Sequence, residues 1–371
     1  MSLGVNLVGY LDSETGTGEA GRLVAAGLEA AGLPFTPVGE VAHASRRQHA
    51  FATVPLDAAR HPVNVVCMNA DMLPAFAAGP GAPLLDGRYT IGFWFWEVTS
   101  VPDRLLRAFD HVDEVWVASH HVADAFAPVA SRPVLRMPLP ILRPPARGRP
   151  ALPERWPAGP VFLFVFDHLS VFARKNPIAV VEAFRLAFPR SGEASLVVKS
   201  INGDQRPAEH ARLRAAAGGR RDVVVLDGYV HASEIHAMTA AASAYVSLHR
   251  AEGFGLTLAQ AMAHGVPVIA TGYSGNLDFT TPFNSHLVDH RIVRIGPDAA
   301  PYPADGVWAE PDVEHAAHLM RRVVEQPEQA ARLGARGRAD ILTQRTPAVA
   351  GAAMRRRLEL VGERAPRPRR R

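Results

Sequence analysis

Short runs of consecutive apolar residues alternate along the chain with longer stretches in which apolar residues recur every three or four positions. The short runs predict buried strands and the longer stretches predict amphipathic helices, so their alternation is typical of a parallel α/β architecture. The predicted strands span residues 5–9, 63–68, 90–95, 114–118, 133–137, 161–166, 194–199, 223–226, 244–248 and 266–271. The predicted helices span residues 18–31, 102–109, 121–127, 176–188, 231–241, 255–264, 312–325 and 327–344.

Prolines interrupt this alternation in the middle of the chain. Five prolines fall between positions 138 and 150, where they exclude a helix interior or a central strand. The alternation restarts near residue 161. We therefore predict two α/β domains, residues 1–150 and 151–345, joined by a proline-rich linker, with a cleft at the carboxyl ends of their strands.

Positive charge is concentrated at the end of the chain. The 371 residues include 40 basic and 36 acidic ones, and residues 352–371 alone hold eight arginines against two glutamates. The remainder is close to neutral, so no nucleic acid is expected as a partner of the folded part. Residues 363–371 have no apolar periodicity and predict a disordered basic tail, a candidate for weak contact with an anionic surface such as a membrane or a nucleic acid.

The composition is that of a globular protein, with 48% hydrophobic and 20% charged residues, which excludes a largely disordered, collagen-like or coiled-coil chain. The single cysteine, Cys67, excludes a disulfide framework and indicates a reducing compartment. No apolar run of about 18 residues occurs, and the first residues lack the basic segment of a secretory signal. We expect a cytoplasmic protein, with the inner membrane surface as a further location.

The densest cluster of chemically informative residues follows a predicted strand. Glu252 lies in a loop with Gly253 and Gly255, and the helix predicted from Gly255 ends at Gly265. Backbone N–H groups at such a glycine-rich helix start favour a phosphate group. Glu252 and Gln260 could then hold a sugar and a nucleoside ribose on either side of a diphosphate. The alternative is that the glycines serve only the turn and that Glu252 is a solvated carboxylate.

Residues 249–270 resemble the E-x7-E motif of retaining glycosyltransferases of family 4, in the form E-G-F-G-L…A-M-A-x-G-x-P-V-I-A. The resemblance implies that Glu252 contacts hydroxyl groups of the donor sugar. It also implies donor binding by Gly253, Phe254, Gly255 and Leu256. Gln260 stands where the family usually has a glutamate that binds the ribose, which removes a charge-assisted increment on the order of 1 kcal/mol per hydrogen bond.

The segment 166–177 resembles the start of the second domain in that family, where an arginine and a lysine hold the donor diphosphate. In the R-K-N-P form of a bacterial subgroup these residues are Arg174 and Lys175. We expect only one of them to face the diphosphate and favour Lys175, because a compact ammonium suits phosphate. Lys199, the only other lysine, ends a predicted strand and is either a donor-binding residue or a solvated strand end.

A second glycine-containing loop follows the strand predicted at 266–271. Small residues there permit a close approach of the backbone to a ligand, although a plain turn would use the same residue types. In family 4 the equivalent loop approaches the donor sugar and its phosphates, which implies donor binding by Ser274, Gly275 and Asn276.

A glycine-rich segment near the start of the chain has two interpretations. Gly16, Gly18 and Gly21 match the G-x-G-x-x-G fingerprint of dinucleotide-binding folds, with Glu40 as the acidic partner, which would suit an NAD-linked oxidoreductase. The fingerprint needs its first glycine directly after the strand, and six residues intervene here. In family 4 a glycine-rich loop at this place faces the cleft, so the resemblance favours Gly16, Thr17 and Gly18 as acceptor or cleft residues.

Two further candidates for the acceptor side follow predicted strands. Glu97 follows the aromatic strand at 90–95, where many family members have a histidine that faces the donor sugar, and is a candidate acceptor contact or base. Ser119 is either a helix N-cap or an acceptor contact. The adjacent His120 and His121 lack a third ligand at a suitable spacing, and we predict no metal site.

The resemblance extends over nearly the whole chain and implies the GT-B fold, two Rossmann-like parallel-sheet domains that face a cleft. It implies that residues 1–150 bind the acceptor, that residues 151–345 bind the donor, and that a helix at 346–360, within a segment 346–362, returns to the first domain. The implied activity is retaining transfer of mannose or glucose from GDP-mannose or UDP-glucose to a glycan, lipid-linked or small-molecule acceptor, without a metal or other cofactor. Two alternatives stay open: a non-catalytic nucleotide-sugar-binding protein, suggested by Gln260, and the NAD-linked oxidoreductase.

Overall fold

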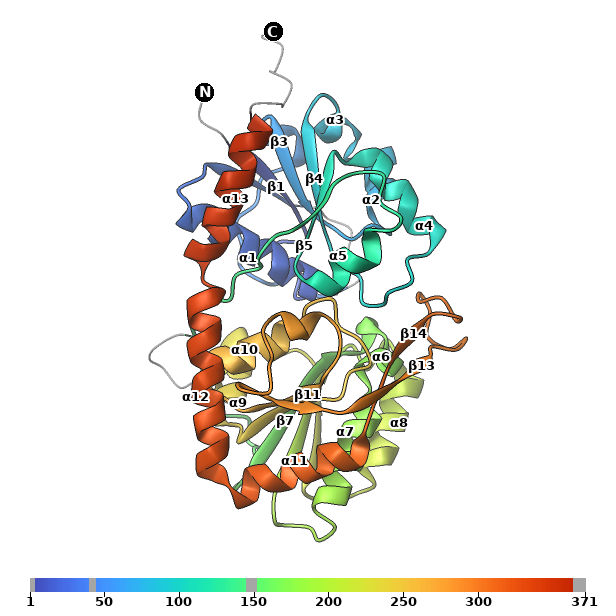
Figure 1. Ribbon diagram of the computed structural model, residues 1–371, viewed down its shortest axis with the longest axis vertical. Coiled ribbons are helices and arrows are strands. Elements are labelled where there is room, and N and C mark those ends of the chain that lie inside the picture. Colours follow the sequence, from blue (N-terminus) through green and yellow to red (C-terminus); the bar gives the residue numbers. More distant parts are fainter. Residues whose placement is uncertain (1–3, 40–44, 145–151, 363–371) are drawn as a thin grey trace. The chain divides into compact units, whose positions relative to one another are not determined.

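The structure is a computed structural model, and the residues that it describes are 4–39, 45–144 and 152–362. The expected basic tail and Glu40 lie outside these residues. The chain divides into two compact units, which consist of residues 1–142 with 344–371 and of residues 143–343 (Figure 1). No helix in the described ranges is long and apolar enough to cross a lipid bilayer.

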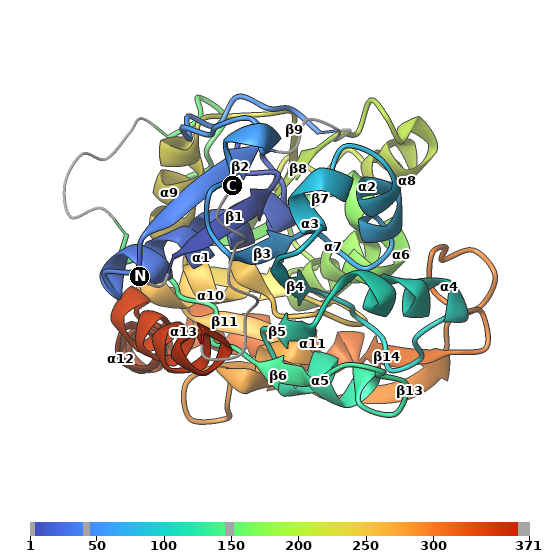
Figure 2. The ribbon, with the colours of Figure 1, turned by 90° about the horizontal axis from the view of Figure 1, so that it is seen from above.

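The first unit is built on a parallel sheet of six strands in the order β2-β1-β3-β4-β5-β6, which Figure 2 shows in sequence across the sheet. Its strands are β1 (Val5–Gly9), β2 (Phe35–Gly39), β3 (Val63–Cys67), β4 (Tyr89–Trp94), β5 (Glu114–Val117) and β6 (Val134–Arg136). The sequence pattern missed β2, which contains Pro37 and has only alternate residues buried. Because β2 is the end strand of this sheet, a proline is tolerated there.

Two helices from opposite ends of the chain pack together in the first unit. The helices of this unit are α1 (Gly16–Ala30), α2 (Leu73–Ala78), α3 (Ala82–Leu85), α4 (Asp103–Leu106), α5 (His120–Phe126) and α13 (Pro347–Gly362). Helix α13 lies along α1, and a Cβ atom added at Gly351 would come within 2.2 Å of the Gly27 carbonyl oxygen. This contact attaches the last described helix to the first unit, and it requires glycine at position 351.

The second unit has its own parallel sheet of six strands in the order β12-β11-β10-β7-β8-β9, and an antiparallel pair of β13 and β14. Its strands are β7 (Val161–Asp167), β8 (Ser195–Ile201), β9 (Val223–Asp227), β10 (Ala244–Ser247), β11 (Val268–Thr271), β12 (His286–Val288), β13 (His290–Arg294) and β14 (Val307–Pro311). The strand order reverses between β7 and β10. In open parallel sheets ligands bind at such a switch point, at the carboxyl ends of the strands.

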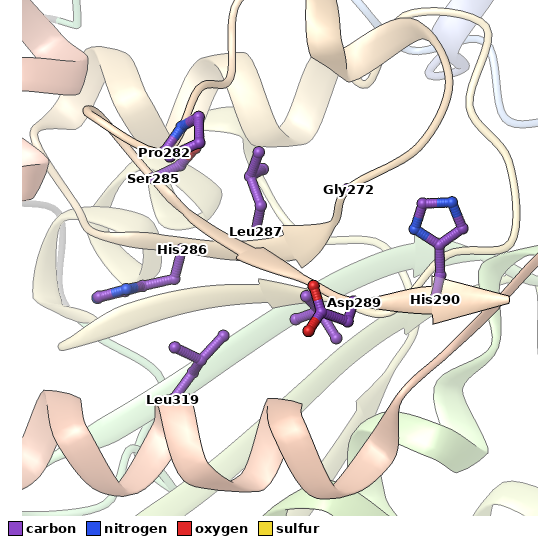
Figure 3. Close-up of a pocket in the computed structure, with 9 residues that line it drawn as sticks. Gly272, Pro282, Ser285, His286, Leu287, Asp289, His290 and Leu319 are labelled. Atoms are coloured by element: carbon purple, nitrogen blue, oxygen red, sulfur yellow. The ribbon is translucent and has the colours of Figure 1, made fainter.

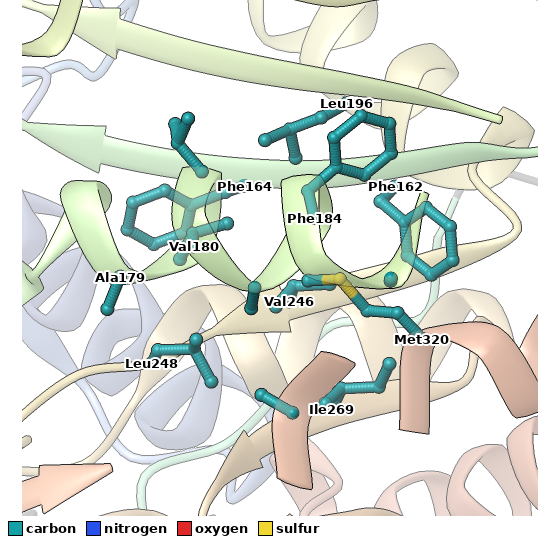
Figure 4. Packing of buried hydrophobic residues seen from close by; sticks show 14 of the residues in the cluster. Phe162, Phe164, Ala179, Val180, Phe184, Leu196, Val246, Leu248, Ile269 and Met320 are labelled. Atoms are coloured by element: carbon teal, nitrogen blue, oxygen red, sulfur yellow. The ribbon is translucent and has the colours of Figure 1, made fainter. Parts of the chain in front are cut away.

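Helices cover the second sheet, and their lengths follow the apolar pattern. They are α6 (Phe172–Lys175), α7 (Pro177–Ala187), α8 (Pro207–Ala217), α9 (Ala232–Ala241), α10 (Leu256–His264), α11 (Val313–Glu325) and α12 (Pro327–Gln344). Helix α7 packs its apolar face on the central strands, where Phe184 contacts Phe162 with ring centroids 6.2 Å apart (Figure 4). The sequence pattern missed α8, since only Leu213 and Ala217 of that helix are buried.

Candidate active site

Two loops of the second unit meet at the carboxyl edge of its sheet. Strand β7 ends at Asp167 and leads into α6, which carries Arg174 and Lys175. Strand β10 ends at Ser247 and leads into the loop that carries Glu252. Because β7 and β10 are neighbours in the sheet, both loops leave it at the switch point, where the fold places a ligand.

Glu252 lies between two cations. Lys175 Nζ donates to Glu252 Oε1 at 2.5 Å, and Arg174 Nη1 lies 3.2 Å from Glu252 Oε2. Only 9% of Glu252 and 4% of Arg174 is exposed. Both cations reach the same carboxylate, so the expectation that one of them points away is wrong for the ligand-free site, and a solvated Glu252 is excluded. Which of them faces a diphosphate stays a prediction. Two positive charges beside one negative charge favour the binding of an anion.

Hydrogen bonds to the backbone fix the two loops against each other. Arg174 donates through Nη1 to the carbonyl of Ala251 and through Nη2 to that of Ser170, each at 2.9 Å. The backbone N–H of Arg250 donates to the Arg174 carbonyl at 2.8 Å. The Arg250 side chain pairs with Glu310 of β14, with Nε and Oε2 2.7 Å apart. The cations are therefore held by the fold before any ligand binds.

The surroundings of Glu252 keep its carboxyl group ionised. Burial alone would raise the pKa of Glu252, but the charges of Lys175 and Arg174 outweigh it and lower this pKa from 4.5 to about 2. Burial lowers the pKa of the adjacent His249, so this ring is neutral at pH 7. His249 Nε2 lies 3.1 Å from Asn276 Oδ1, so His249 supplies a hydrogen bond and no charge.

Helix α10 begins directly after the Glu252 loop. Gly255 occupies its N-cap with a φ of +93°, and no side chain caps the helix there. Gly265 ends the helix with a φ of +79°, which confirms the boundaries predicted from the two glycines. The backbone N–H groups of the first turn, at the positive end of the helix dipole, thus lie near Glu252 along the chain, in an arrangement that suits a phosphate group.

Residues 160–340 match the family model of glycosyl transferases group 1. This region contains Glu252, Lys175 and Arg174 and ends within α12. It lies within the second unit, which has the switch-point sheet. The match therefore supports a glycosyltransferase, and it concerns the unit that carries the two cations.

Several solved structures share the fold of both units. The chain is similar to sucrose-phosphate synthase from Thermosynechococcus elongatus with a TM-score of 0.67 at 16% identity, over 97% of this chain and 99% of that one. It is similar to HepE from Anabaena, solved with UDP and glucose, with a TM-score of 0.65 at 12% identity, over 96% and 100% of the two chains. It is also similar to a UDP-forming α,α-trehalose-phosphate synthase from Burkholderia xenovorans, with a TM-score of 0.61 at 14% identity over 81% and 74%.

These likenesses identify the architecture. The two sheets of six parallel strands are those of GT-B glycosyltransferase structures, so the expected GT-B fold is confirmed. No protein with a curated description matches the chain.

The loop after β11 completes the candidate site from the side opposite to α6 along the chain. The Glu252 N–H donates to Ser274 Oγ at 2.8 Å, and Ser274 Oγ donates to the Tyr273 carbonyl at 2.6 Å. A Cβ atom added at Gly275 would lie 2.3 Å from the Gly253 carbonyl oxygen, so the two loops touch backbone to backbone. Ser274 takes a φ of +74°, a conformation that non-glycine residues rarely adopt, and its two hydrogen bonds hold it there.

The remaining expected donor residues of α10 and its loop differ in exposure. Phe254 is buried, with its ring centroid 5.0 Å from that of Phe279, so its side chain packs against Phe279 and anchors the loop that carries Glu252. Leu256 and Gln260 lie on α10 and are both partly exposed. Gln260 is therefore partly accessible, whereas the Phe254 ring serves packing.

Lys199 lies at the carboxyl end of β8 and is buried, with 2% exposed, so a solvated strand end is excluded. Its Nζ donates to the carbonyl of Ser200 at 2.7 Å and to the carbonyl of Gly228. Lys199 thereby ties the ends of β8 and β9 together at the ligand edge of the sheet.

The glycine-rich segment of the first unit forms the start of α1. Thr15 caps this helix by accepting from the Gly18 N–H at 3.1 Å. A Cβ atom at Gly18 would lie 2.6 Å from the Tyr10 carbonyl oxygen, whereas one at Gly16 would have open space around it. Gly18 therefore serves the close packing of the helix start, and Gly16 and Thr17 remain candidate contacts.

The other two candidates of the first unit follow β4 and β5. Ser119 is buried and caps α5 by accepting from the Val122 N–H at 3.3 Å, which bears out the cap interpretation. Glu97 is partly buried, and its carbonyl oxygen lies 2.8 Å from His121 Nε2. His121 thus braces the segment that carries Glu97.

An open pocket lies at β12, beside α11 (Figure 3). Its lining residues are Gly272, Pro282, Ser285, His286, Leu287, Val288, Asp289, His290 and Leu319. None of them is Glu252, Lys175 or Arg174, so this hollow is separate from the cation pair, and we assign the chemistry to the latter.

Two groups that shape the candidate site do not stand out in the sequence. His249 lies within the motif and Glu310 within a longer segment, and each contacts a residue of the site loops. His249 stands three residues before Glu252, and Glu310 lies in a strand far along the chain, so neither gives a periodic signal. Adjacent polar residues at a strand end were the one feature that pointed to His249.

Proposed function

We propose that this chain is a retaining glycosyltransferase that moves a hexose from a nucleotide diphosphate sugar to an acceptor hydroxyl group. One observation carries the proposal: Lys175 and Arg174 converge on the buried Glu252 at the switch point of the second sheet, beside the uncapped start of α10. The group 1 match over residues 160–340 and the GT-B fold support it.

The donor diphosphate would take the place of Glu252 as the partner of Lys175. In the ligand-free arrangement Lys175 Nζ is 2.5 Å from Glu252 Oε1, while Arg174 is also held by two carbonyls. Lys175 is therefore the cation that can turn towards a phosphate, since Arg174 would lose two further bonds. Its departure frees Glu252 to accept hydrogen bonds from hydroxyl groups of the donor sugar.

The proposed reaction uses no nucleophile from the protein. The acceptor oxygen bonds to the anomeric carbon on the face from which the diphosphate leaves, the bond from that carbon to the diphosphate oxygen breaks, and the acceptor proton moves to the leaving phosphate. Lys175, Arg174 and the N–H groups of α10 stabilise the negative charge that develops on the diphosphate. These groups supply the neutralisation for which other enzymes use a metal ion, so we propose transfer without one.

We propose mannose or glucose as the sugar, with GDP-mannose and UDP-glucose as the first donors to test. HepE, a structure with the same fold, was solved with UDP and glucose, which supports a nucleotide-linked hexose. The acceptor would be a glycan, a lipid-linked sugar or a small molecule. Gln260 on α10 is partly exposed and would bind the donor ribose through its amide.

The test measures binding and turnover on the same samples. UDP, GDP, UDP-glucose and GDP-mannose are compared in a thermal-shift assay, in which a ligand at about 100 times its Kd adds about 2.7 kcal/mol. Turnover is the release of UDP or GDP from the donor, with monosaccharides or water as acceptor. We expect Glu252→Gln to lose at least about 100-fold in turnover while nucleotide binding persists, and Lys175→Ala to weaken nucleotide binding.

The control is Glu314→Gln, which removes an exposed carboxylate of α11 and should change neither quantity. Turnover of Glu252→Gln at the wild-type rate would overturn the assignment of the site. Binding without turnover for every donor would support the non-catalytic nucleotide-sugar-binding protein. A shift with NAD and none with nucleotide sugars would support the oxidoreductase.

A further inference from the structure

A second cluster of polar side chains lies at the ligand edge of the second sheet, on its β8–β9 side. His168 follows β7, His210 lies on α8, and Asp227 is the last residue of β9. Each offers one ligand atom, and these atoms all lie within 4.8 Å of one another. The cluster therefore brings two imidazoles and a carboxylate to one point from three separate elements.

The cluster contains buried polar atoms without hydrogen bonds. His168 is 1% exposed, and neither of its ring nitrogens has a hydrogen-bond partner within the described ranges. The same holds for His210 Nδ1 and for Oε2 of Glu209, the residue before it on α8. Buried polar atoms of folded proteins are nearly always paired, so unpaired nitrogens on two neighbouring buried histidine rings point to a ligand that binds one nitrogen of each.

Gly203, in the loop after β8, makes room for the cluster. A Cβ atom added there would lie 2.5 Å from Asp227 Oδ2 and 2.7 Å from His210 Nδ1. These two atoms therefore converge on the same point above the glycine. Any side chain at position 203 would occupy the space between them.

Neighbouring hydrogen bonds orient the cluster. Ser200 Oγ donates to Asp227 Oδ1 at 2.6 Å, which leaves Oδ2 directed at the cluster. Asn202 donates to Asp167 Oδ1 at 2.8 Å and accepts from the Tyr229 hydroxyl at 2.8 Å. The loops after β7, β8 and β9 are thus tied together around the three side chains, as is common around bound metals.

We propose that His168, His210 and Asp227 bind a divalent transition-metal ion, zinc by preference, with one ligand atom each and a water molecule in the fourth position. Imidazole with carboxylate is a donor set typical of zinc, whereas calcium and magnesium prefer oxygen ligands alone. Tetrahedral ligands at about 2.0–2.1 Å from zinc are about 3.3–3.4 Å apart, so the three ligand atoms, which lie within 4.8 Å of one another, would have to approach by up to about 1.5 Å. Glu209 Oε2 lies 3.9 Å from His168 Nδ1.

The ion would have a structural effect on the candidate active site. His168 begins the segment that continues into α6, where Arg174 and Lys175 lie six and seven residues further on. Fixing His168 to α8 and β9 anchors the start of that segment. Metal binding is independent of the proposed sugar transfer, so an experiment that refutes one of these two proposals leaves the other standing.

The test is zinc binding by the whole chain, measured after removal of metal with a chelator. We expect one zinc ion per chain by calorimetry, an increase in Tm on zinc addition, and the intense visible absorption of tetrahedral cobalt when Co²⁺ replaces zinc. Asp227→Asn and His210→Gln should each lower the affinity for zinc more than tenfold. Asp227 is exposed, so its substitution leaves the folded state intact even if a change at the buried His168 does not.

The matched control is His318→Gln, which removes an exposed histidine of α11 and should leave stoichiometry and affinity unchanged. Zinc binding well below one equivalent in the wild type would overturn the proposal. So would an affinity in Asp227→Asn and His210→Gln equal to that of the wild type, or a cobalt spectrum without the tetrahedral bands.

Discussion

The coupling between Lys175 and Glu252 can be measured directly through protein stability. The side chains are 15% and 11% exposed, so the pair is largely shielded from solvent. Removing one partner of a buried ion pair costs about 3–5 kcal/mol. In Lys175→Ala the carboxylate keeps Arg174 at 3.2 Å, so we expect a smaller loss, about 2 kcal/mol in the free energy of unfolding.

The pH dependence gives a second measure of the same interaction. The fall of the Glu252 pKa from 4.5 to about 2 corresponds to roughly 3 kcal/mol at about 1.4 kcal/mol per pH unit. Because the folded-state pKa lies below the unfolded one, this stabilisation is complete above about pH 5 and is lost as the pH falls towards 2. The difference in stability between wild type and Glu252→Gln should therefore shrink across that interval.

The assay is a double-mutant cycle by urea unfolding, with Lys175→Ala, Glu252→Gln and the double variant at pH 7 and at pH 3. We expect a coupling energy of about 1–2 kcal/mol at pH 7 and less at pH 3. The control cycle uses Arg332 and Glu328 of α12, which are 3.7 Å apart but 70% and 87% exposed, and should show no measurable coupling. Additive effects of the two substitutions at pH 7, within about 0.5 kcal/mol, would refute the electrostatic account of the site.

Three further predictions concern single residues. Gln260→Glu should provide a charge-assisted hydrogen bond to the donor ribose and lower the Kd of the nucleotide by up to about tenfold in calorimetry. The control Gln329→Glu, at an exposed position, should leave the Kd unchanged. An unchanged Kd in Gln260→Glu would exclude Gln260 from the ribose site. Gly351→Ala should lower the free energy of unfolding in urea by about 1–3 kcal/mol, because its Cβ would lie 2.2 Å from the Gly27 carbonyl oxygen. The control Gly16→Ala, with open space around it, should have little effect. Equal effects of the two substitutions would contradict the close helix contact. Lys199→Met should leave the carbonyls of Ser200 and Gly228 without their donor and lower the free energy of unfolding by about 1–3 kcal/mol. A variant as stable as the wild type would show that these two hydrogen bonds contribute nothing to stability.

The strands of both sheets were accessible to sequence analysis because most are buried on two faces and read as unbroken apolar runs. Each predicted strand is present within two residues of its predicted bounds. The missed β13 pairs only with β14 and has no fully buried residue, so its pattern does not differ from that of a polar loop. The helix α10 was well predicted since Gly255 and Gly265 take positive φ values and mark its two ends in the sequence itself.

The sequence predicted which residues form the candidate site better than it predicted how their side chains are arranged. Glu252, Arg174 and Lys175 could be named from motifs, but the motifs do not give the directions of the two cations, of which only one was expected to face the diphosphate. Helix α6 is a single turn of four residues between Val171 and Asn176, which both take positive φ values, and its two long side chains reach the same carboxylate. The cluster around His168 was hidden because its members come from three distant segments, which no spacing rule connects.

The packing of α13 on α1 has a consequence for the order in which the molecule is completed. Helix α1 and all six strands of the first unit's sheet are synthesised before any part of the second unit, yet the surface around Gly27 is covered only when Gly351 has left the ribosome. During translation the first unit therefore carries an uncovered helix face while the entire second unit is being made. A stop codon after α12 would remove the last 27 residues and leave that face permanently uncovered. Such a truncation at one end of the chain should therefore impair the folding of the unit that begins at the other end.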